Sequence, residues 1–95
     1  MKCEMIVRVE QPDEKRVDEL GVRNWPTLEK EVCRIDWFFD STEESYFLAG
    51  RVIVETEDGQ RVEVKKGDLA VFPKGLKCTW FIEEPMQKHF NILDD

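Results

Sequence analysis

Two residues able to do chemistry stand out: a cysteine at the start of an apolar run and the only histidine of the chain. Cys78 lies in FPKGLKCTW, residues 72–80, directly after a turn built on Pro73 and Gly75. A thiol in this place can bind a metal, act as a nucleophile, or fill the core as a small apolar residue. His89 can serve as a base, a metal ligand or a structural residue bonded to backbone or solvent. These roles depend on which strands carry the two side chains.

The elements that must position these residues are mostly short strands. From residue 33 to 39 apolar residues recur at every second position, which is typical of a half-buried strand. Later apolar runs are separated by glycine or proline turns, and the pair at 58–59 indicates a hairpin. Seven or so such strands predict an all-β sandwich or barrel. The expected turns lie at residues 58–59, 66–68, 73–75 and 83–86.

The chain is expected to form one domain in two stretches. Residues 1–24 would supply a strand over 3–9 and one short helix within 11–22, with Pro12 in its first turn and Gly21 at its end. Residues 25–95 would form the β-barrel. A length of 95 residues suits a single hydrophobic core.

Composition excludes several partners. The chain carries a formal charge of −7, which repels nucleic acid and anionic lipid. Its apolar runs are too short for a membrane span or signal peptide. Three cysteines, Cys3, Cys33 and Cys78, are odd in number and widely spaced, so no disulfide framework is indicated. We therefore expect a cytoplasmic, reducing location with no nucleic-acid or membrane partner.

Two spacings anchored on glycine resemble those of the cupin superfamily. GDLAVFPKGLKC reads G-x5-P-x-G-x2-C, like the second cupin motif with Cys78 at its histidine position. Glu43 stands seven residues before Gly50, as at the end of the first motif. The His-x-His pair of that first motif would fall at Trp37 and Phe39, or at Asp36 and Phe38 with the longer spacing, and neither register offers a histidine.

Within cupins, the chain is similar to a small single-domain subgroup related to (S)-ureidoglycine aminohydrolase and the ethanolamine-utilisation cupins. The resemblance covers residues 25–93. It implies an all-β double-stranded β-helix, or jelly roll, that forms a homodimer and has a pocket at one barrel mouth. Because this fold hosts enzymes, binding modules and storage proteins, the resemblance does not by itself imply a reaction.

The resemblance also implies a divalent metal held by three histidines and one glutamate. Only Glu43 and Cys78 remain at those positions, and two ligands seldom hold a metal. The cofactor is therefore unknown; if a metal is bound, His89 would be its third ligand. The same three residues are the candidates for catalysis.

The convergence of these residues depends on one hairpin. If residues 83–86 form its loop, Asn91 faces Cys78 and His89 faces Trp80, all on one side of the sheet. His89 would then be a diagonal neighbour of Cys78, about 7–8 Å away between backbones. A register slip of one residue would turn His89 to the opposite face.

Aromatic residues would share the inward face with Glu43 and Cys78: these are Trp37, Phe39 and Trp80. They are either simple core or, together with Asn91, the lining of a pocket for a small organic molecule. We expect either an enzyme similar to ureidoglycine aminohydrolase or a ligand-binding or sensing cupin that has lost its metal. A structural dimer or storage role is a third alternative.

Overall fold

The computed structural model describes residues 6–93, which form seven strands, one helix and one 3-10 turn. Residues 3–5 of the predicted strand over 3–9, Cys3 among them, lie outside this range, and the first described strand covers residues 8–10. The helix was expected within residues 11–22, and its position is confirmed. The elements are β1 (Arg8–Glu10), α1 (Glu14–Leu20), the 3-10 turn η1 (Val22–Asn24), β2 (Thr27–Lys30), β3 (Cys33–Phe38), β4 (Thr42–Thr56), β5 (Arg61–Lys65), β6 (Leu69–Phe72) and β7 (Lys77–Leu93).

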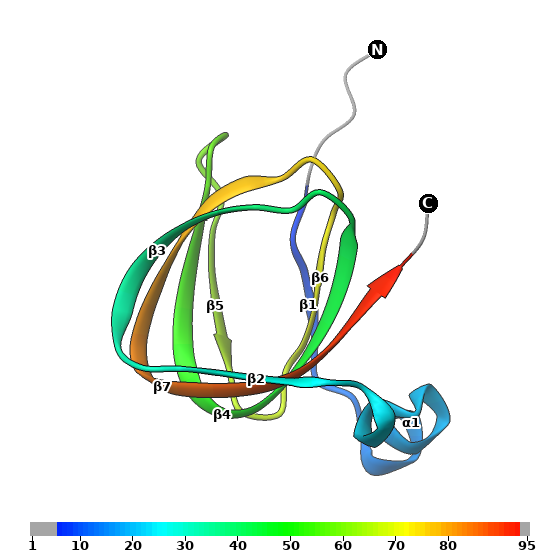
Figure 1. Ribbon diagram of the computed structural model, residues 1–95. Coiled ribbons are helices and arrows are strands. Elements are labelled where there is room, and N and C mark those ends of the chain that lie inside the picture. Colours follow the sequence, from blue (N-terminus) through cyan, green and yellow to red (C-terminus); the bar gives the residue numbers. More distant parts are fainter. Residues whose placement is uncertain (1–5, 94–95) are drawn as a thin grey trace.

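Helix α1 has a clear start and end. The side chain of Asp13 accepts a hydrogen bond from the backbone N–H of Arg16 at 2.9 Å, which caps the first turn. Gly21 ends the helix with a positive φ of 70°, a conformation that glycine adopts without steric cost. Figure 1 shows the helix outside the barrel at one end. No helix among the described residues is long and apolar enough to cross a membrane.

The barrel is organised by two long strands, β4 and β7. They pair antiparallel from Thr42 opposite Leu93 to Thr56 opposite Cys78, and both curve around the interior (Figure 1). Strands β2 and β3 add to β7, while β5 and β6 add to β4, and β1 pairs with β6. The predicted all-β, single-domain jelly roll is confirmed.

The expected hairpin at 83–86 is wrong, because β7 continues through these residues without a turn. The register between β4 and β7 shifts here, so that Ala49 lies opposite Gln87 and Arg51 opposite Glu84. Gly50 allows this close passage: a Cβ at its position would lie 2.4 Å from the carbonyl oxygen of Pro85. Proline is tolerated in a strand at such an irregularity, and a sharp bend results in place of a loop.

The core lies between β4, β6 and the first half of β7, and aromatic rings dominate it. Phe39 stacks on Phe72 with ring centroids 4.8 Å apart, and Trp80 contacts Phe47 and Phe72. Phe39 is 3% exposed and belongs to this cluster. The structure places Phe39 in the core, and not in the lining of the cavity as expected, because the chain leaves β3 just before it and turns its ring inward.

Candidate functional site

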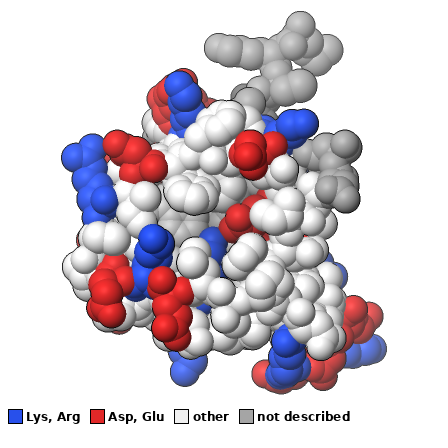
Figure 2. Space-filling view, viewed as in Figure 1, with Lys and Arg blue, Asp and Glu red and all other residues white. Residues whose placement is uncertain are grey.

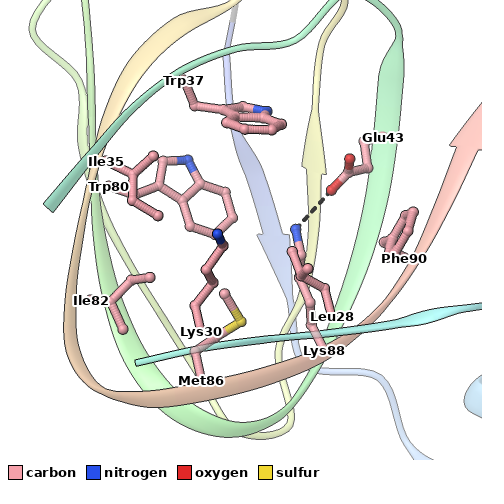
Figure 3. A pocket seen from close by; sticks show the side chains of 10 residues that line it. All are labelled: Leu28, Lys30, Ile35, Trp37, Glu43, Trp80, Ile82, Met86, Lys88 and Phe90. Carbon is pink, nitrogen blue, oxygen red and sulfur yellow. Dashed lines mark hydrogen bonds and ion pairs between the residues drawn. The ribbon is translucent and has the colours of Figure 1, made fainter. Parts of the chain in front are cut away.

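A cavity of about 280 Å³ lies at one end of the barrel and opens to solvent. Figure 2 shows it as a hollow with mostly uncharged walls and with both positive and negative groups inside. Side chains from β2, β3, β4 and β7 form the walls (Figure 3). The lining residues are Leu28, Lys30, Ile35, Trp37, Glu43, Trp80, Ile82, Met86, Lys88 and Phe90.

Strand alternation explains why these residues face inward. On β7 alternate residues point to the interior on both sides of the bend: Trp80 and Ile82 before it, and Met86, Lys88 and Phe90 after it, while Glu84 at the bend is exposed. On β3, Ile35 lies opposite Trp80 and shares its face. The period of two that predicted a strand over 33–39 thus also places this side of the cavity.

An ion pair forms the polar centre of the cavity. The ammonium of Lys88 donates a hydrogen bond to Glu43 Oε2 at 2.8 Å and another to Ser45 Oγ at 3.1 Å. The Ser45 hydroxyl in turn donates to the same carboxylate oxygen at 2.8 Å. The side chains of Lys88 and Glu43 are only 5% and 10% exposed. Buried charges of this kind persist only when they are paired.

Aromatic rings surround the Lys88 ammonium. It lies 4.7 Å from the centre of the Trp80 ring and within 6 Å of the rings of Phe47 and Phe72. Burial among them lowers the pKa of Lys88, and the nearby charge of Glu43 opposes this shift. The lysine therefore holds its proton less firmly than an exposed lysine does, while the carboxylate beside it favours the charged form.

Cys78 is packed in the core cluster and does not line the cavity that contains the ion pair. It is 6% exposed, lies opposite Thr56 and Trp37, and borders a different surface hollow from the one that contains Glu43. Burial raises the pKa of its thiol, against smaller opposing effects of Trp80 and the charge of Lys88. A raised pKa keeps the thiol protonated near neutral pH, so the geometry favours packing over thiolate chemistry.

His89 and Asn91 lie outside the cavity, which corrects their predicted placement. His89 lies opposite Tyr46 and Thr27, and its Nδ1 is 2.9 Å from the backbone oxygen of Trp25. Asn91 donates to Glu44 Oε1 at 3.2 Å. Because β7 has no hairpin, Cys78 and His89 lie near opposite ends of a single strand and do not converge. The structure therefore brings together Glu43, Trp37 and Trp80 from the predicted set.

The donor set does not fit the metal that the cupin resemblance implies. No three residues of metal-binding type converge within residues 6–93. The aromatic side chains of Trp37 and Phe39 stand where the first motif has histidines, and Glu43 already binds the ammonium of Lys88. The ammonium of Lys88 thus occupies the position beside the Glu43 carboxylate that a metal occupies in metal-binding cupins.

The fold and its central cavity are those of a cupin barrel, and comparison with known proteins agrees. A family model described as a EutQ-like cupin domain matches residues 17–90. The chain belongs to this EutQ-like cupin family, as the sequence resemblance predicted.

Solved structures extend the comparison. A DUF861 family protein from Thermotoga maritima is 46% identical, with a TM-score of 0.91 over 93% of this chain and 100% of that chain. The EutQ protein of Clostridium difficile is 21% identical, with a TM-score of 0.64, and the match covers 70% of this chain and 52% of that chain. A putative ethanolamine utilization protein Q from Salmonella typhimurium is 20% identical, with a TM-score of 0.63 over 70% and 53% of the two chains. The two EutQ matches show the fold alone. A search of curated proteins gives no significant match.

Sequence reasoning missed Lys88, although one signal pointed to it. A buried glutamate needs a positive or hydrogen-bonding partner. Counted along an uninterrupted strand, Lys88 shares the even-numbered face of Trp80 and Ile82, among apolar residues. The expected hairpin would instead have placed the odd-numbered residues His89 and Asn91 on the inward face, opposite Trp80 and Cys78.

Proposed function

We propose that this EutQ-like cupin binds a small, largely apolar and planar organic molecule in its barrel cavity, without a metal. The observation that carries this proposal is an apolar cavity that closes around one buried ion pair, Glu43 and Lys88. Small-molecule sites are commonly built in this way, with apolar walls and few polar groups that orient the ligand.

The size and walls of the cavity support a ligand of one or two rings. A volume of about 280 Å³ corresponds to roughly nine water molecules. Trp80 forms a buried wall and Trp37, which is 50% exposed, stands at the mouth (Figure 3). A planar ligand between these indoles would bury aromatic surface and gain offset or edge-to-face contacts.

The test compares two aromatic residues that are adjacent and similarly exposed. Trp37 lines the cavity, whereas Phe38, at 54% exposed, does not. Binding of one- and two-ring fragments would be followed by NMR through the methyl group of Met86, which forms part of the wall. We expect Trp37→Ala to weaken binding about tenfold, from the loss of roughly 1.5 kcal/mol of aromatic contact, and Phe38→Ala to leave it unchanged. Equal effects of both variants would contradict the proposal.

A metal-independent hydrolase, similar in type to ureidoglycine aminohydrolase, is a second candidate. The observation in its favour is the ion pair itself, since a carboxylate and a lysine of lowered pKa form a proton acceptor and donor that border the cavity. Turnover of ureido compounds in the presence of a chelator, lost in Glu43→Gln, would support this candidate. Saturable binding without turnover would leave the binding role alone.

A further inference from the structure

Lys30 is a second positive group at the cavity, near its mouth. Strand β2 pairs with β7 so that Lys30 lies opposite Met86 and Leu28 lies opposite Lys88. Directly opposite residues share a face of the sheet, so Lys30 projects toward the same interior as Met86 and Lys88. Figure 3 shows its ammonium directed into the space beside Trp80.

The two lysines differ in their pairing. Lys88 is buried and bound to Glu43, whereas Lys30 is exposed and forms no ion pair with any described residue. The cavity lining therefore has two positive groups and one negative group, and carries one net positive charge, in a chain whose formal charge is −7. A net positive charge on the cavity walls of an otherwise acidic protein favours a ligand with one negative charge.

The inner end of the cavity offers a different contact. Glu43 Oε2 accepts hydrogen bonds from Ser45 and Lys88, whereas Oε1 has no partner among residues 6–93. This free carboxylate oxygen can accept an N–H or O–H from a ligand. The backbones of Lys30 and Lys88 are diagonal neighbours across β2 and β7, about 7–8 Å apart, and Lys88 in turn binds Glu43, so both lysines and the carboxylate face the same cavity.

We propose that the ligand is a small aromatic monoanion: its carboxylate meets Lys30 at the mouth, its ring lies between Trp37 and Trp80, and a donor at its far end meets Glu43. This assignment rests on the proposed binding function and specifies its ligand class. Lys30 acts as a specificity residue, because it selects the charge of the ligand.

The experiment uses matched fragments that share a ring skeleton and carry different charges. Benzene, indole and naphthalene skeletons would each be tested as carboxylate, carboxamide and aminomethyl compounds, with and without a hydroxyl on the opposite side of the ring. Binding to the 95-residue chain would be measured through the Met86 methyl signal and by calorimetry. The protein variants are Lys30→Gln, Lys30→Glu and a control, Lys66→Gln, whose lysine lies in the turn after β5, away from the cavity lining.

We expect each carboxylate to bind more tightly than its carboxamide, and the aminomethyl compound to bind most weakly. Lys30→Gln should weaken carboxylate binding about three- to fivefold, the effect of a partly exposed ion pair, and should leave the carboxamide unchanged. Lys30→Glu should reverse the preference, and Lys66→Gln should have no effect. Fragments that bind regardless of charge would overturn this inference but leave the binding function standing. If no fragment of any charge binds in the cavity, both are refuted.

Discussion

Removal of the Lys88 ammonium should destabilise the protein in a way that depends on pH. In Lys88→Met the unbranched apolar stem is kept, but the Glu43 carboxylate, 10% exposed, loses its positive partner. It must then stay charged in an apolar cavity or take up a proton. Protonating a carboxyl with an ordinary pKa of about 4.3 costs about 3.7 kcal/mol at pH 7, which sets a ceiling on the loss.

We therefore expect Lys88→Met to lower the free energy of unfolding by up to about 3.7 kcal/mol at pH 7, within the range seen when one partner of a buried ion pair is removed. The loss should shrink by about 1.4 kcal/mol per pH unit and fall to about 1 kcal/mol at pH 5, because protonation then becomes cheap. A domain of this size has about 5–15 kcal/mol of stability, so the variant should still fold.

Urea unfolding followed by tryptophan fluorescence at pH 5, 6 and 7 would measure the difference from the wild-type protein. The double variant Glu43→Gln/Lys88→Met removes both charges and should recover most of the loss, with a coupling of about 2–3 kcal/mol between the two sites. A loss below about 1 kcal/mol that does not change with pH, or a double variant no more stable than Lys88→Met, would refute the assignment of a buried ion pair.

Three further outcomes follow from the structure. Gly50→Ala should cost about 2–5 kcal/mol in urea unfolding, because strain at positive φ adds to a clash with the β7 backbone. Gly59→Ala, which has a similar φ but open space around it, should cost only about 1–2 kcal/mol. Equal losses in the two variants would exclude the clash. Alkylation with iodoacetamide, mapped by mass spectrometry, should modify the exposed Cys33 much faster than Cys78, whose thiol pKa is raised by burial. Faster modification of Cys78 would indicate that its thiol is a reactive thiolate after all. An NMR titration should find the pKa of Lys88 below its ordinary value of 10.5. Since the unfolded chain then binds the proton more tightly, this group should make stability rise with pH between the two values. A pKa at or above 10.5 would contradict the prediction that burial outweighs the charge of Glu43.

Local patterns were sufficient to predict the barrel and one part of its site. The period of two over residues 33–39 placed Ile35 and Trp37 on one face, and the spacing of the glycine turns pointed to the cupin family. The same spacing placed Glu43 inside. These features depend on alternation and turn chemistry, which a sequence displays directly.

The course of β7 and the remaining site residues depend on pairing between residues that are far apart in the sequence. Glu83, Glu84 and Pro85 have the composition of a turn, yet β7 continues through them as a bent strand because Gly50, far away in the sequence, leaves room for its backbone. This single difference moved His89 and Asn91 out of the expected site. It brought in Lys88, whose position near Glu43 depends on tertiary packing and not on local propensity.

An ion pair within the chain, in the place of a metal, forms the polar centre of this cupin cavity. The most direct test is elemental analysis of protein purified without an affinity tag after growth with iron, manganese, nickel and zinc, for the wild-type chain and Glu43→Gln. We expect less than stoichiometric metal in both proteins and no difference between them. One equivalent of metal in the wild-type protein that disappears in Glu43→Gln would contradict the assignment.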